Sequence, residues 1–128
     1  MTLQEYFENS RGIGILSTAD SDGNVNAAVY ARPHFMDDGS IAFIMTDRLT
    51  HSNLKSNPKA AYLFKEEGKG YNGKRLYCTK LKEEENCDLI HSLSRKKYHT
   101  ALKSDEKTTR YLVYFRIDAV LPLIGDKE

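Results

Sequence analysis

The sequence has 128 residues, which is enough for one domain with a hydrophobic core and too few for two substantial domains. Its 19 basic and 18 acidic residues nearly cancel, so the net charge of +1 gives no argument for binding nucleic acid or a membrane surface. No apolar run approaches the roughly 20 residues of a membrane helix, and the acidic N-terminal segment lacks the pattern of a secretory signal. We therefore expect a single cytoplasmic domain over residues 1–128.

Apolar residues make up 40% of the chain, and tryptophan is absent. This share is below that of a typical globular protein, and it fits a small domain that buries part of its surface against a partner subunit. The two cysteines, Cys78 and Cys87, have no CxxC spacing, and no group of histidines, cysteines or carboxylates has metal-ligand spacing. We therefore expect two free thiols and no metal site.

The chain opens with a predicted helix, and turn signals divide the residues that follow into strands. Apolar residues at i, i+3 and i+4 predict a helix over Thr2–Asn9, with Thr2 as its cap. Aspartate–glycine pairs in Asp20–Asn24 and Asp37–Ser40 predict hairpin turns, because these residues tolerate positive φ. Pro33 cannot donate to a ladder and should end a strand. The six expected strands are Ile13–Thr18, Val25–Arg32, Ile41–Thr46, Lys59–Lys65, Lys74–Lys82 and Arg110–Val120.

The second half of the chain contains the longest predicted helix. Glu83–Lys97 has three acidic residues in its first turn and basic residues in its last, which complements a helix dipole. A polar loop is expected over His99–Thr109. Because tight hairpins dominate, we expect a mainly β fold with flanking helices, in the form of a six-stranded antiparallel barrel that closes its own edges.

The segment Thr46–Pro58 joins two predicted strands and contains hydroxyl, amide and basic side chains. Strand-end donors followed by a short helix suit a phosphate, because the N-terminus of a helix favours an anion. The alternative is an ordinary capped helix, with Thr46 or Asp47 as the cap and Leu49 and Leu54 facing the core.

The order of these elements resembles the pyridoxamine 5′-phosphate oxidase-like family of FMN-binding split barrels. The resemblance extends from about Leu3 to Lys82, and it depends on the order and spacing of several motifs together. The segments that carry it are Ile13–Thr18, Asn26–Pro33, Thr46–Pro58 (with the pattern T-x-x-x-T-x-x-N-L-x-x-N-P) and Gly70–Tyr77.

The resemblance implies a homodimer with FMN between its subunits. By matching positions, the phosphate would be held by Arg32 at the end of the second strand and by the segment around the short helix. The isoalloxazine ring would lie along Asn26–Arg32, where small residues allow a close approach. The implied FMN-binding residues are Asn26, Ala28, Val29, Tyr30, Ala31, Arg32, Thr46, Asp47, Arg48, Thr50, His51, Ser52 and Asn53.

The sequence departs from the family pattern at one position. Many members have a lysine immediately before the Asn-Leu helix, whereas this chain has Thr50, His51 and Ser52 there. Arg48 or His51 could supply the missing charge. We expect His51 either to pair with the phosphate or to face solvent, and His34 to be a polar residue at a strand end.

The implied function is that of a small FMN-dependent oxidoreductase acting with a small-molecule redox substrate or electron donor. No residue is identified as a catalytic acid or base, and Cys78 is expected to be a buried hydrophobe. Tyr71 and Arg75 could line a substrate pocket. The alternatives are a non-catalytic flavin-binding or electron-transfer module, a haem or deazaflavin binder on the same fold, and a barrel with no ligand. A haem would need an axial ligand from among His34, His51, His91 and His99.

Overall fold

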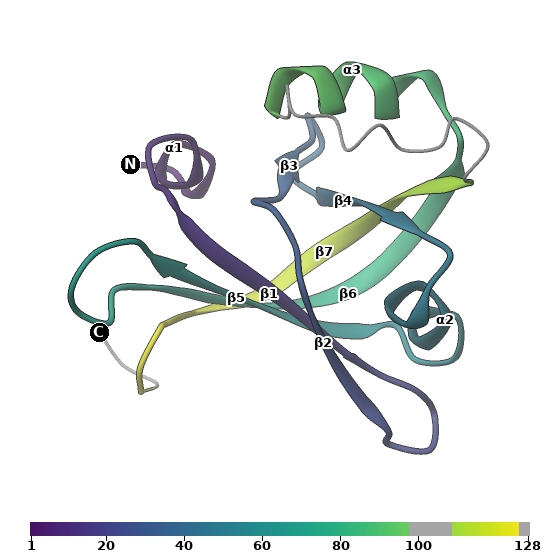
Figure 1. Cartoon of the computed structure of the whole chain (residues 1–128), viewed down its shortest axis with the longest axis horizontal. Coiled ribbons are helices and arrows are strands. Elements are labelled where there is room, and N and C mark those ends of the chain that lie inside the picture. The colour runs from purple at the N-terminus through teal and green to yellow at the C-terminus, as the bar shows by residue number, and fades with distance from the viewer. Residues whose placement is uncertain (98–108, 126–128) are drawn as a thin grey trace.

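The computed structural model describes residues 1–97 and 109–125, which form a mainly β structure with three helices (Figure 1). None of these helices is long and apolar enough to cross a membrane. The expected loop His99–Thr109 lies outside the described residues except for its last position. The helices are α1 (Leu3–Glu8), α2 (Leu49–Ser56) and α3 (Asp88–Lys97). The strands are β1 (Gly12–Ala19), β2 (Val25–Val29), β3 (His34–Phe35), β4 (Ile41–Thr46), β5 (Lys59–Glu66), β6 (Gly73–Glu85) and β7 (Arg110–Pro122).

The strands form one antiparallel sheet with the hydrogen-bonded order β2-β1-β5-β6-β7-β4-β3. The described part of the chain therefore has seven strands in an open sheet, so the expected six-stranded barrel with closed edges is wrong in its count and its closure. The extra strand is β3, which pairs with the start of β4. Pro33 has no N–H to donate, and pairing stops at Val29 instead of Arg32 before it resumes at the other end of the sheet.

The N-terminal helix and the first hairpin turn form as the sequence predicts. In the capping box of α1, the Thr2 hydroxyl accepts from the Glu5 N–H at 3.1 Å and the Glu5 carboxylate accepts from the Thr2 N–H at 2.9 Å. In the turn, the Asp20 carboxylate accepts from the backbone and side chain of Asn24, and Gly23 adopts a φ of 88°. These local bonds explain why both features can be predicted without knowledge of the fold.

The helix α3 begins five residues later than the sequence predicts. Residues Glu83–Glu85 continue β6, where they pair with Val113, Leu112 and Tyr111 of β7. The strand ends at Asn86, whose φ of 44° is one that asparagine tolerates better than most residues. Pairing with β7 therefore outweighs the local preference of three consecutive acids for a helix start.

The helix α2 forms within Thr46–Pro58, but its cap and buried face differ from the expectation. Its N-cap is Arg48 instead of Thr46 or Asp47. Leu54 is buried, whereas Leu49 is 58% exposed. The buried residues of α2 are Thr50, His51, Asn53 and Leu54. This mostly polar face points toward the sheet, and Leu49 therefore points outward.

The main core lies on the concave side of the sheet and combines residues from α1, α2 and five strands. Phe43 is near its centre, with its ring centroid 5.0 Å from that of Tyr62 and 5.8 Å from that of Phe115. The strand β1 can approach Tyr62 closely because residue 14 is glycine. A Cβ at Gly14 would lie 1.9 Å from the Tyr62 hydroxyl oxygen. That hydroxyl donates to the carbonyl of Tyr30 at 3.2 Å, which fastens the end of β2 over the core.

The helix α3 covers one half of the outer side of the sheet, and the other half carries exposed apolar side chains. On β4 and β7, a second apolar cluster that includes Leu112 and Tyr114 packs beneath α3 through Ile90. On the half formed by β2, β1, β5 and β6, large apolar side chains are exposed, including Val25 (82%) and Val29 (70%). We call this half the open face; strand register places on it Val25, Ala27, Val29, Ile15, Ser17, Ala61, Leu63 and Tyr77.

Candidate functional site

Polar side chains join the start of α2 to β1 and β2. Thr50 is buried, and its hydroxyl accepts from the Asn26 amide at 3.2 Å. The Tyr30 hydroxyl is also hydrogen-bonded to Thr50. Further along α2, the Asn53 amide donates to the hydroxyl of Thr18 at 3.1 Å. We call these five residues the α2 junction. The sequence indicates four of them, but Thr18 was missed because a threonine within a strand gives no distinguishing signal.

The start of α2 offers hydrogen-bond donors that could meet an anion. Within the described residues no side chain caps the helix, although the Ser52 N–H donates to the Arg48 carbonyl at 2.9 Å. N–H groups of the first helical turn have no partner within a helix and carry the positive end of its dipole. The side chains of Arg48 and Ser52 are exposed at this end, and Thr46 is half-buried at the end of β4.

Arg32 lies after β2 and anchors α1. Its Nη1 donates to the carbonyls of Phe7 at 2.9 Å and Ser10 at 2.6 Å. Phe7 lies in the last turn of α1 and Ser10 just beyond the helix, where a positive charge complements the helix dipole. Both bonds use the same nitrogen, and a guanidinium has five N–H donors in total. Arg32 therefore has a structural role here, and its contact with a phosphate stays a prediction.

His51 is fully buried and lies between two carboxylates. Its Nδ1 is 2.9 Å from the Asp47 Oδ1, and its Nε2 is 3.0 Å from the nearer oxygen of Glu83. Its ring stacks on Tyr111 with centroids 3.9 Å apart. This geometry corrects the expectation that His51 faces solvent. Both ring nitrogens contact carboxylates, and a contact of His51 with a phosphate stays a prediction.

Both carboxylates beside His51 are held in the ionised form. The hydrogen bond from His51 lowers the pKa of Asp47. Partial burial raises the pKa of Glu83, but the hydrogen bonds from Lys80 and His51 outweigh it and the net shift is downward. Lys80 lies 2.6 Å from Glu83. Glu83 and Lys80 come from β6, so the sequence around His51 gives no sign of them.

The residues predicted to lie along the flavin ring divide between the two faces of β2. Asn26, Ala28 and Tyr30 are half-buried on the side of α2, and Tyr30 packs edge-on against Phe43 with centroids 5.9 Å apart. Val29 and Ala31 are exposed on the other side. This division follows from the two-residue alternation of a strand, so a flat ring could lie against one set of side chains or against the strand edge.

The four histidines differ in their surroundings. His34 lies at a strand end, as expected, since it is the first residue of β3, and it is buried at 7% exposure. His91 is exposed on α3. His51 has both ring nitrogens engaged, and His99 lies outside the described residues. Among the described residues, a haem ligand would therefore have to be one of the buried histidines, His34 and His51, or the exposed His91 on α3.

Cys78 and Arg75, both on β6, also have clear structural roles. Burial, together with the charge of Asp118, raises the pKa of the Cys78 thiol to about 12, which confirms it as an unreactive buried residue. Arg75 donates from Nε to the Pro122 carbonyl at 2.9 Å and thereby holds the end of β7. Tyr71 is 73% exposed. A role for Tyr71 and Arg75 near a ligand stays a prediction.

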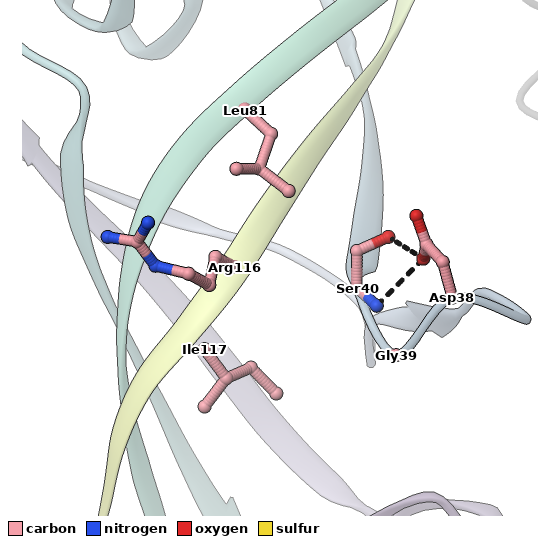
Figure 2. A pocket seen from close by; sticks show the side chains of 6 residues that line it. All are labelled: Asp38, Gly39, Ser40, Leu81, Arg116 and Ile117. Atoms are coloured by element: carbon pink, nitrogen blue, oxygen red, sulfur yellow. Dashed lines mark hydrogen bonds between the residues drawn. The ribbon is translucent and has the colours of Figure 1, made fainter.

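The described surface has two depressions, of which the second borders the α2 junction through Thr18. The first has a volume of about 190 Å³ beside the second hairpin turn, where the Ser40 N–H and hydroxyl both donate to Asp38 (Figure 2). Its lining residues are Asp38, Gly39, Ser40, Leu81, Arg116 and Ile117. The second, of about 300 Å³, is shallow and lies over the open face between Val25 and Tyr77. The first is smaller than a typical cofactor pocket of roughly 300–1,000 Å³.

Comparison with known proteins identifies the fold. No family model matches the chain, and no curated protein matches it. Among solved structures, an FMN-binding protein from Syntrophomonas wolfei subsp. wolfei has a TM-score of 0.72 at 20% identity, covering 93% of this chain and 82% of its own. This chain has the split-barrel fold of flavin-binding proteins.

Two further structures with this fold differ in what their descriptions name. A candidate pyridoxamine 5′-phosphate oxidase from Lactobacillus delbrueckii has a TM-score of 0.65 at 18% identity, covering 94% of this chain and 93% of its own. The haem storage protein HutZ from Vibrio cholerae has a TM-score of 0.68 at 14% identity, covering 93% and 91%. At these identities the likeness shows the fold, and the choice of ligand needs a separate argument.

Replacing Thr50 with valine should destabilise the fold by about 1–3 kcal/mol, the cost of leaving buried polar partners unpaired. The substitution keeps the side-chain shape but removes the oxygen that meets Asn26 and Tyr30. Urea unfolding followed by circular dichroism measures the change. The exposed Ser52→Ala on the same helix is the control and should change stability by less than about 0.5 kcal/mol. Equal stability of Thr50→Val and wild type would contradict a stabilising role for the hydrogen bonds of the α2 junction.

Proposed function

We propose that the protein binds FMN at the α2 junction and acts as a small flavin-dependent oxidoreductase. The observation that carries the proposal is the contact of Thr50 with Asn26 and Tyr30, which places the uncapped start of α2 against β2. A helix start suits a phosphate, and an accessible strand with small side chains suits a flat ring. The fold adds support, since an FMN-binding protein and a candidate pyridoxamine 5′-phosphate oxidase share it.

The residues present fit the charge and the donors that a flavin phosphate needs. Arg32 and Arg48 supply guanidinium groups, and Ser52 supplies an exposed hydroxyl beside the first-turn N–H groups of α2. Asp47 is an exposed carboxylate in the same turn, and it is compatible with an anion only if its charge is balanced. Bound flavin would supply the electron or hydride chemistry, while the protein binds the cofactor and orients its ring.

The open face supports a homodimer. Val25 and Val29 are more than two-thirds exposed, and Tyr77, which is 37% exposed, adds apolar surface to the same face of the sheet. Contiguous exposed apolar surface is characteristic of an interaction site. The flavin ring along β2 would then lie at the edge of this interface, where the partner subunit could cover it.

Haem is the second candidate, because HutZ shares the fold. It is the weaker one, since His51 has both nitrogens engaged and His91 is exposed on α3. A flavin module without turnover and a deazaflavin binder are further alternatives that share the proposed site. These four possibilities differ in their spectra and in their reduction by a substrate.

The absorption spectrum of the purified protein, before and after addition of FMN, tests the proposal directly. We expect the two visible bands of oxidised flavin to remain with the protein through gel filtration and to bleach when a nicotinamide donor is added. Retained flavin that no donor reduces would favour the module without turnover. A Soret band would favour haem, and a protein that retains neither chromophore would refute the proposal.

Replacing Arg32 with alanine should weaken FMN binding by about 1.5–3 kcal/mol, the contribution of hydrogen bonds to a charged group. Fluorescence titration of FMN measures the dissociation constant. The control is Arg116→Ala, which removes an exposed arginine from β7, 59% accessible in its side chain, and should leave FMN affinity unchanged. Because Arg32 also anchors α1, unfolding curves are needed to confirm that the variant is folded. Unchanged affinity in a folded variant would remove Arg32 from the phosphate site.

Replacing Val29 with glutamate should convert the proposed dimer to a monomer, because it places a charge on the apolar open face, where Val29 is 70% exposed. Sedimentation velocity on both proteins measures the mass. The control is Leu89→Glu on α3, where the replaced side chain is also exposed (40%) but lies away from the open face. A wild-type protein that sediments as a monomer, or a dimeric Val29→Glu protein, would contradict a dimer through this face.

A further inference from the structure

His51 connects three elements of the fold at the proposed phosphate site. Its Nδ1 faces the Asp47 carboxylate just before α2, and its Nε2 faces the Glu83 carboxylate on β6. Its ring stacks on Tyr111 of β7. Since His51 is fully buried on the first turn of α2, these contacts fix the position of the helix start relative to the sheet.

The geometry specifies the protonation state of this ring. An ionised carboxylate only accepts hydrogen bonds, and a neutral imidazole has one N–H and one lone pair. At one of the two contacts of the ring, a neutral His51 would therefore direct a lone pair toward a carboxylate oxygen about 3 Å away. The cation, with two N–H groups, satisfies both carboxylates.

The other charges around the ring leave this balance in place. On β6, Lys80 contacts Glu83 at 2.6 Å and balances that carboxylate. On α2, Lys55 is near enough to attract Asp47 but is exposed to solvent. On the sheet side, Glu85 lies close to Tyr111 and adds negative charge. Asp47 therefore depends on His51 for a buried, directly bonded counter-charge.

We propose that His51 is a doubly protonated latch that holds the start of α2 on the sheet and neutralises Asp47, so that flavin affinity falls when this cation is removed. The effect on affinity rests on the proposed function, whereas the protonated latch does not. With the cation in place, both hydrogen bonds are present and the turn carries no excess negative charge. Without it, at least one bond is lost and Asp47 repels the phosphate.

The size of the effect on affinity follows from the charge that is removed. The lowered pKa values of Asp47 and Glu83 keep both carboxylates ionised, which preserves their bonds to His51. The interaction of one unit charge with a dianionic phosphate roughly 10 Å away, at an effective dielectric constant of about 40, changes affinity by about tenfold.

The first test uses wild-type protein without flavin. Nitrogen-15 NMR of the histidine rings at neutral pH distinguishes a doubly protonated ring, with two similar shifts, from a neutral one with a single unprotonated nitrogen. The resonances of His51 are assigned by their loss in His51→Gln. Two protonated nitrogens are expected. An unprotonated nitrogen at His51 would overturn the latch, whether or not the protein binds flavin.

The second test measures FMN affinity at about pH 7.5, where a phosphate monoester with a second pKa near 6 is dianionic. Folded His51→Gln should bind FMN about tenfold more weakly than wild type. Adding Asp47→Asn to His51→Gln should restore most of the lost affinity, because it removes the unbalanced charge. A purely structural role for His51 predicts no such restoration.

The control for the second test is His91→Gln, which changes an exposed histidine on α3 and should keep the affinity of wild type. Wild-type affinity in folded His51→Gln would overturn the proposed effect on flavin binding. If wild type does not bind FMN at all, the proposed function fails together with the effect on affinity, and the NMR measurement still decides whether the latch exists.

Discussion

The pairing of β6 with β7 is the interaction on which the rest of this structure depends. Both strands have 13 residues, and they pair along nearly their whole length. Their concave side contributes Leu76 and Phe115 to the main core, and the outer side of β7 supports α3 through Leu112. The same pairing carries Glu83 and Tyr111 to the buried ring of His51. The position of α2 is thus set by strands that are distant from it in sequence.

Features that depend on local chemistry could be predicted from the sequence. The capping box of α1, the aspartate–glycine turns and the alternation of buried residues in β5 and β6 need only neighbouring residues. The main error in secondary structure has a non-local cause. Glu83–Glu85 carry the charges of a helix start, but their hydrogen bonds to β7 place them in a strand. No property of those three residues indicates that β7 exists.

The candidate site also combines features that the sequence predicts with features that it does not. The polar character of Thr46–Pro58 and the proximity of Asn26 to Thr50 follow from the order of motifs. The partners of His51 could not be foreseen, since Glu83 is 32 positions away in the chain. Arg32 was expected to point only at a phosphate, but the carbonyls at the end of α1 also attract its guanidinium. A charged side chain bonds to the groups that the tertiary fold brings near it. A sequence pattern can therefore identify the donor but not its acceptor.

The unequal ends of the sheet limit how these molecules can aggregate. A terminal strand presents free N–H and C=O groups that can template pairing with another chain. At one end β3 has only two residues and is preceded by Pro33, so it offers almost nothing to pair with. At the other end β2 is longer and borders the apolar open face. Among the described strands, the sheet therefore offers a second chain one long edge to pair with and one very short edge, which disfavours growth in both directions into a filament.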